Sequence, residues 1–239
     1  MSEIHGVLRF EPDGPPGVGM ERWEDMNPDD LVAGTPVQNG HTYHEDAGAG
    51  YLAGVWDCTA FTDAFGPYAV DEFMWLIDGS VIMVMPDGAE VTVEAGQAFV
   101  LPKGLQCQWK QPGYVRKFFM ILDGPVPDMA ANPALSRVTV PDLGPVPLPP
   151  GAVEARRTDF VNAAGNMQVA QRNLAAVTLP PQPSAASHLI QVLEGQLQLS
   201  DAAGEHSFAP GETAYVPQGS VTGWRSVQGT RLLQASFRL

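Results

Sequence analysis

Basic residues, cysteines and long apolar runs are all scarce in this chain. Lysine and arginine together number 13 against 27 aspartates and glutamates, which gives a formal net charge of −14. This charge repels phosphate backbones and anionic lipids, so we expect no nucleic-acid and no membrane partner. The two cysteines, Cys58 and Cys107, form no disulfide framework. Without a signal-like or membrane-spanning apolar stretch, the expected location is cytoplasmic.

The common nucleotide and nucleophile motifs are also missing. The sequence contains no P-loop, no GxGxxG after a strand, no GxSxG and no CxxC. What it has instead is turn formers, with 25 glycines and 22 prolines. That number is high for a helical protein and ordinary for a turn-rich β protein.

The clearest pattern lies between Tyr68 and Trp109, where short apolar runs alternate with turn signals such as Asp78-Gly79. Evenly spaced short strands of this kind predict a small antiparallel barrel or sandwich. The expected strands cover residues 72–77, 80–85, 91–93, 98–101 and 105–109.

The same pattern occurs a second time. The sequence HLIQVLEG at 188–195 matches EFMWLIDG at 72–79, and GETAYVPQG at 211–219 matches GQAFVLPKG at 96–104. In each copy a tryptophan, Trp109 or Trp224, follows the proline at the same spacing, and a closing strand comes next. A fixed order of glycine, proline and tryptophan in both halves indicates an internal duplication.

The duplication predicts a chain of four parts. We expect an N-terminal arm over 1–40, a first barrel over 41–125, a proline-rich linker over 126–150 and a second barrel over 151–239. The first barrel is expected to open with a strand over 51–61, and the closing strands are expected over 115–122 and 230–237. Residues 138–140 are expected to pair with a barrel edge, and Pro180–Pro183 to form a turn.

A polar segment, His41–Asp46, has two readings. Its histidines and acidic residues could form a metal cluster, but a polar loop or edge strand is favoured because short motifs of this kind are weak signals.

The two motifs, EFMWLIDG and GQAFVLPKGLQCQW, resemble those of the cupin superfamily. The tail of the first half looks most like the ureidoglycine aminohydrolase-like cupin domain, and the second half is similar to a generic cupin. The resemblance implies an all-β bicupin, with two tandem double-stranded β-helix barrels of the jelly-roll-like kind. It is specific for the fold and much less so for a function.

Cupins of this kind usually hold a divalent metal in each barrel through three histidines and a glutamate, a donor set that suits Mn, Fe, Ni or Zn. In the first half only Glu72 matches this pattern, because Gly66, Tyr68 and Cys107 stand where histidines are expected. In the second half His188 occupies the glutamate position. Gln182, Ser184 and Thr222 stand at the histidine positions. We therefore predict no metal and no other cofactor, with a divalent metal as the minority alternative.

Strand alternation indicates which side chains share each barrel interior. It predicts two apolar pockets with a few polar groups, as small-molecule sites have, although filling of a narrow barrel explains the same pattern. The candidates are Tyr68, Glu72, Met74, Cys107, Trp109 and Lys117 in the first barrel, and Ser184, His188, Thr222 and Trp224 in the second.

Glu72 is the most informative of these residues. A buried carboxylate needs a partner, and either Arg116 or Lys117 should face it, because adjacent strand residues point to opposite sides. A structural ion pair and a role as general base both remain open for Glu72. Two roles likewise remain open for His188, that of a buried core histidine and that of a proton-transfer group.

Two functions remain. The first is a bicupin without metal that binds a small polar metabolite in barrel one, with barrel two as a scaffold. The second is an aminohydrolase-like enzyme acting on a small ureide or related nitrogen compound. A homodimer formed through sheet edges is compatible with both. Stoichiometric Mn, Fe, Ni or Zn in the purified protein would favour the enzyme.

Overall fold

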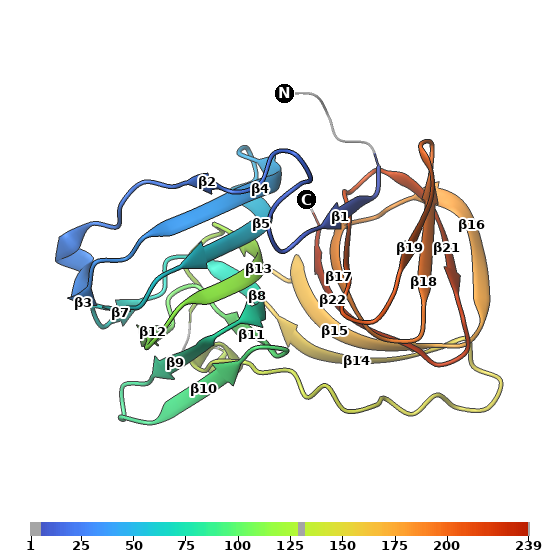
Figure 1. The fold of residues 1–239 in the computed structure, drawn as a ribbon. Coiled ribbons are helices and arrows are strands. Elements are labelled where there is room, and N and C mark those ends of the chain that lie inside the picture. The colour runs from blue at the N-terminus through green and yellow to red at the C-terminus, as the bar shows by residue number, and fades with distance from the viewer. Residues whose placement is uncertain (1–5, 129–131, 239) are drawn as a thin grey trace. The chain divides into compact units, whose positions relative to one another are not determined.

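The computed structural model describes residues 6–128 and 132–238 and confirms the all-β prediction (Figure 1). Among these residues the only helices are two 3₁₀ turns, η1 (Pro28–Asp30) and η2 (Pro133–Ser136). No helix in the described part of the chain is long and apolar enough to cross a membrane.

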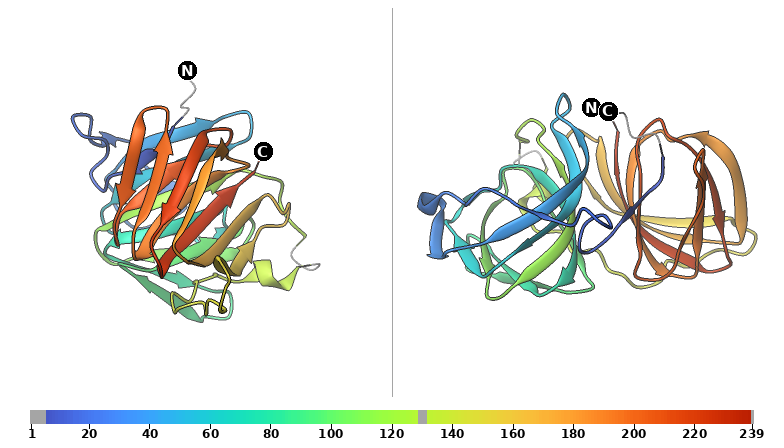
Figure 2. Two further views of the ribbon diagram at one scale, coloured as in Figure 1. Left: turned by 90° about the vertical axis from the view of Figure 1, so that its right-hand side faces the viewer. Right: turned by 45° about the horizontal axis from the view of Figure 1, so that its top comes forward.

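The chain folds into two compact units, each with its own core. Barrel one comprises residues 11–128, 132–141 and 162–164, and barrel two comprises 6–10, 142–161 and 165–238. Figure 2 shows the strands of each unit wrapped into a barrel. Each unit is therefore a double-stranded β-helix, as the duplicated motifs predict.

Barrel one is built from two antiparallel sheets. The order of the first is β11-β8-β13-β5-β4-β2, and that of the second is β10-β9-β12-β6-β3, with β7 pairing to β12. Their bounds are β2 (Glu21–Arg22), β3 (Leu31–Gly34), β4 (Gln38–Asp46), β5 (Tyr51–Cys58), β6 (Phe61–Asp63), β7 (Gly66–Pro67), β8 (Asp71–Asp78), β9 (Ser80–Val84), β10 (Glu90–Glu94), β11 (Ala98–Leu101), β12 (Gln106–Gln111) and β13 (Val115–Leu122).

Barrel two repeats this plan. Its larger sheet has the order β1-β20-β17-β22-β15-β14 and its smaller sheet has the order β16-β21-β18-β19. The bounds are β1 (Leu8–Phe10), β14 (Glu154–Val161), β15 (Met167–Leu174), β16 (Val177–Pro183), β17 (Ser187–Glu194), β18 (Leu197–Asp201), β19 (Gly204–Phe208), β20 (Thr213–Val216), β21 (Val221–Ser226) and β22 (Thr230–Phe237).

The repeated glycines have a physical reason. Gly79 and Gly195 end the matching strands β8 and β17 with φ of 78° and 76°. A Cβ atom at Gly79 would collide with the carbonyl oxygen of Tyr114, and one at Gly195 would lie 2.7 Å from Cα of Thr230. Only glycine combines this backbone conformation with so close an approach of the next strand.

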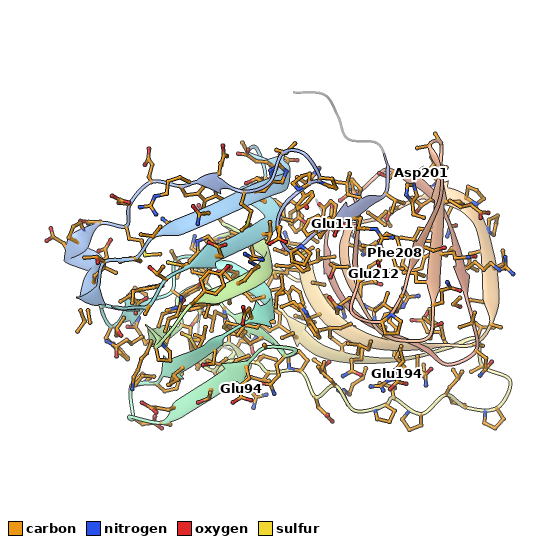
Figure 3. All side chains as sticks on the ribbon, viewed as in Figure 1. Glu11, Glu94, Glu194, Asp201, Phe208 and Glu212 are labelled. Atoms are coloured by element: carbon orange, nitrogen blue, oxygen red, sulfur yellow. The ribbon has the colours of Figure 1, made fainter. Side chains whose placement is uncertain are left out.

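The N-terminal arm contributes to both units. β2 and β3 join barrel one, whereas β1 pairs with β20 of barrel two. Three side chains of barrel two that contact this first segment, Asp201, Phe208 and Glu212, are labelled in Figure 3. The backbone N–H of Val7 donates to Asp201 at 2.7 Å, and the Arg9 guanidinium lies over Phe208 and pairs with Glu212 at 2.5 Å.

The linker region likewise has tertiary partners. Thr139 forms an antiparallel bridge with Val100, as expected for residues 138–140, and residues 142–150 belong to barrel two. Residues 1–5, 129–131 and 239 of the expected arm, linker and second barrel lie outside the described residues.

Both His41–Asp46 and Pro180–Pro183 form parts of strands. His41–Asp46 lies in β4, which agrees with the edge-strand reading, because β2 pairs with Asn39 and Gly40 of β4 and not with this segment. The turn predicted over Pro180–Pro183 is wrong, because these residues belong to β16. β16 is an exposed edge strand whose pairing is interrupted between Leu179 and Gln182, and prolines are tolerated there because no ladder N–H is needed.

Candidate functional site

The interior of barrel one holds a cavity of about 240 Å³. Its wall is largely aromatic, with acidic and basic groups at one place, the usual make-up of a small-molecule site. Alternation along β8 and β13 brings Glu72 and Lys117 to the same side as the core residues Met74 and Phe119. The lining residues are Trp23, Met26, Gln38, Trp56, Phe61, Asp63, Tyr68, Glu72, Trp109, Lys117, Phe119 and Ile121.

Glu72 lies at the centre of a buried polar network. Lys117 Nζ donates to its Oε1 at 2.8 Å, and the Tyr68 hydroxyl donates to its Oε2. The Glu72 and Lys117 side chains are 4% and 8% exposed. Burial and the Glu72 charge hold the pKa of Tyr68 well above its ordinary value, so the phenol stays protonated. Both carboxylate oxygens therefore have partners, which a buried charge requires.

Of the two cations on β13, Lys117 faces in. Arg116 lies on the other face of the strand and pairs with Asp57 at 3.4 Å and with Asp13. Adjacent residues of a strand point to opposite faces of the sheet, and this alternation separates the two cations.

Two tryptophans enclose the Lys117 ammonium. Its nitrogen lies 4.8 Å from the ring centroid of Trp56 and 5.0 Å from that of Trp109, within the range of cation–π attraction. The indole N–H of Trp56 donates to Gln38 at 2.9 Å, and that of Trp109 to Gln111 at 3.1 Å. These hydrogen bonds orient the two rings.

A second carboxyl, Asp63, lines the same cavity. Its Oδ1 accepts a hydrogen bond from the backbone N–H of Trp109 at 2.6 Å. Burial raises the pKa of Asp63 to about 6, in spite of that hydrogen bond, which lowers it. Asp63 can therefore exchange a proton near neutral pH, as a general acid or base must.

The residues of barrel one do not fit a transition metal. Burial raises the pKa of the Cys107 thiol to about 12, with a further contribution from Asp63, so the thiolate that binds metal is disfavoured. Tyr68 is protonated and both oxygens of Glu72 are engaged. Within 6–128 and 132–238, no three His, Cys, Asp or Glu side chains are grouped so as to hold a metal ion.

Barrel two presents a different interior. His188 Nδ1 lies 2.9 Å from Ser236 Oγ and 3.0 Å from Gln234 Nε2. Burial first, and then the charges of three arginines, lower the pKa of His188 to about 4, so the imidazole is neutral at pH 7. Those arginines are Arg172, Arg156 and Arg238.

The other residues expected in a second pocket are dispersed. Trp224 lies beneath the Arg172 guanidinium at 5.2 Å and lines a cavity of about 50 Å³ and a groove of about 300 Å³. Ser184 donates to the carbonyl of Ala186, and Thr222 is buried opposite Gln182. Among the residues that the structure places, neither Ser184 nor Thr222 nor His188 lines these two spaces.

In barrel one, four of the six expected residues line the cavity. They are Tyr68, Glu72, Trp109 and Lys117. Met74 lies behind them, with its sulfur 3.2 Å from Lys117 Nζ, and Cys107 is buried in the core.

Sequence reasoning missed most of the aromatic wall. Trp56 and Phe61 lie in the segment predicted as the first strand, where alternation would have suggested Trp56. Trp23 and Met26 come from the N-terminal arm, which carries no periodic signal. Trp23 reaches the cavity by packing edge-on against Phe119, with ring centroids 6.2 Å apart.

Comparisons with known proteins agree with this architecture. Residues 46–119 match the family model of the EutQ-like cupin domain. No curated protein sequence matches the chain. The chain therefore has a cupin fold, and residues 46–119 of its first barrel are similar to the EutQ-like cupin domain.

Solved structures resemble the whole chain. A DUF861-family protein of unknown function from Pseudomonas syringae pv. tomato superposes with a TM-score of 0.73 at 20% identity, covering 96% of this chain and 98% of that one. A cupin 2 conserved barrel domain protein from Leptotrichia buccalis gives 0.62 at 10% identity, covering 91% and 98%. The DUF861 protein Ylba from E. coli gives 0.57 at 12% identity, covering 97% and 91%. At these identities the likeness concerns the fold.

Proposed function

We propose that barrel one binds a small metabolite, with a polar group of the ligand at Glu72 and Lys117 and its apolar part against the aromatic wall. The observation that carries this proposal is a buried, hydrogen-bonded ion pair at the wall of a cavity of about 240 Å³. An aromatic and apolar wall encloses a ligand, and a few fixed polar groups orient it. Barrel two, which includes strand β1, serves mainly as a scaffold.

A binding experiment tests this function. A metabolite library is screened by thermal shift, and hits are titrated by tryptophan fluorescence, because Trp23, Trp56 and Trp109 line the cavity. Glu72→Gln should weaken binding of a hit by about 1.5–3 kcal/mol, the range for a hydrogen bond to a charged group. His188→Gln is the matched control in barrel two and should leave binding unchanged. A larger loss from His188→Gln than from Glu72→Gln would move the site to barrel two.

One observation favours a second function, a cupin enzyme related to the aminohydrolases and acting on a small ureide or similar nitrogen compound. Asp63 lies at the cavity with a pKa of about 6, where a general acid or base is effective. Turnover of such compounds that is lost in Asp63→Asn and retained in His188→Gln would support the enzyme. Ligand binding without turnover would support the binding protein.

A further inference from the structure

Barrel one buries the acid Glu72, and the described residues around it form no set of metal donors. Some other positive group must therefore balance the charge of this acid. Glu72 is 3% exposed, and a carboxylate so deeply buried requires a positive partner or a proton. The residue that meets it is Lys117, whose ammonium lies 2.8 Å from Oε1.

The surroundings of the Lys117 nitrogen are those of a bound cation. Besides Glu72, it contacts the Met74 sulfur at 3.2 Å and lies about equally far from the Trp56 and Trp109 ring centroids, at 4.8 and 5.0 Å. A carboxylate, a soft sulfur and two aromatic faces are all groups that attract an ammonium ion. They come from three different strands, β5, β8 and β12, and lie between residues 56 and 109 of the sequence.

We infer that barrel one contains an ammonium-binding subsite, made by Glu72, Met74, Trp56 and Trp109, which the chain fills with its own Lys117 in place of a divalent metal. This inference deepens the proposed function, because Lys117 then presents its remaining N–H to the cavity. Ligands with a carbonyl or carboxylate oxygen are favoured at that point, and cationic ligands are repelled.

Truncation of the lysine provides a direct test. Lys117→Ala removes three methylene groups and the ammonium, a fragment with the composition of propylammonium. The variant should melt about 10 °C below wild type, because it leaves a buried carboxylate unpaired. Propylammonium chloride at millimolar concentration should restore at least half of this loss in a saturable manner, whereas sodium chloride at the same ionic strength should not.

Three controls define the site. Lys110→Ala removes an exposed lysine of the same barrel, which pairs with Glu90 at 3.3 Å, and should show no response to propylammonium. Wild type should not respond either, because its subsite is filled. The double variant Glu72→Gln/Lys117→Ala should lose most of the response, because a neutral amide attracts a cation far less than a carboxylate does.

The outcomes decide whether barrel one contains an ammonium-binding subsite. No stabilisation of Lys117→Ala beyond that of sodium chloride overturns the inference, as does a stoichiometric transition metal in wild type that is lost in Glu72→Gln. If Lys117→Ala is insoluble, soluble yield on refolding with propylammonium replaces the melting curve. A gain over sodium chloride supports the subsite and equal yields overturn it. Since the experiment needs no natural ligand, it can fail or succeed independently of the ligand screen.

Discussion

At the scale of single residues, charge and burial decide the chemistry of barrel one. Glu72, Lys117 and Tyr68 form a closed network in which each polar group has a partner. Asp63 is different, because its Oδ1 accepts from the Trp109 N–H while burial is the largest influence on its pKa. The pair Glu72–Lys117 therefore supplies a fixed dipole, and Asp63 supplies the group that titrates.

Asp63 should make the stability of barrel one depend on pH. Its pKa rises from 3.8 to about 6 on folding, so the folded state holds the proton more tightly than the unfolded state. The resulting stabilisation is complete below about pH 4 and is lost as the pH rises through about 6. We expect wild type to lose roughly 1 kcal/mol relative to Asp63→Asn over this range, less than the full shift implies because the carboxyl is partly exposed. Urea unfolding of both proteins at several pH values measures the difference, and parallel curves would contradict the assignment.

At the scale of strands and turns, the duplicated motifs correspond to duplicated backbone constraints. Strand β8 ends at Asp78 and β17 at Glu194, each followed by a glycine with positive φ. The next strand of the sheet, β13 or β22, then passes so close that a side chain at the glycine is excluded. Glycine is therefore required at these two turns both by the close packing of the neighbouring strand and by the backbone conformation.

Substitution of Gly79 tests this explanation. Gly79→Ala combines a strained φ with a collision against Tyr114 and should destabilise barrel one by about 2–3 kcal/mol. Gly96 also has positive φ, 84°, but open space around it, so Gly96→Ala should cost only about 1 kcal/mol. Gly113→Ala, at a position with neither constraint, should be nearly neutral. Equal losses at Gly79 and Gly96, measured by denaturant unfolding, would show that the collision is relieved without cost.

At the scale of the whole molecule, the two folded units are not continuous in the sequence. The first described segment, with β1, belongs to the sheet that contains the last strand, although about 130 residues of barrel one lie between β1 and residue 142. Phe10 is 2% exposed and stacks on Tyr215 with ring centroids 5.3 Å apart. Barrel two therefore depends on residues from the beginning of the chain.

Loss of the Phe10 ring should affect barrel two. Phe10→Ala should cost about 3–5 kcal/mol, the usual effect of removing a buried phenylalanine. Val18→Ala, which shortens a side chain that is 71% exposed, is the control and should stay within about 0.5 kcal/mol. Amide hydrogen exchange followed by peptide mass spectrometry should show the loss of protection in β17 and β20. Equal deprotection in β8 and β13 would contradict a specific dependence of barrel two on β1.

Several expectations drawn from composition remain predictions at this scale. The net charge of −14 still argues against nucleic-acid and membrane partners, and absence of a cofactor, cytoplasmic location and homodimerisation await measurement.

The sequence alone determined the fold class, the duplication and the lack of the usual metal-ligand pattern, because alternation, turn glycines and residue identities are local properties. It also singled out Glu72 and limited its partner to Arg116 or Lys117. Only the tertiary structure decided that Lys117 is this partner, that Trp23 and Asp63 reach the same cavity and that β1 joins barrel two. These features arise from contacts between segments far apart in the sequence. Such contacts depend on how the strands twist and close, which no local pattern specifies.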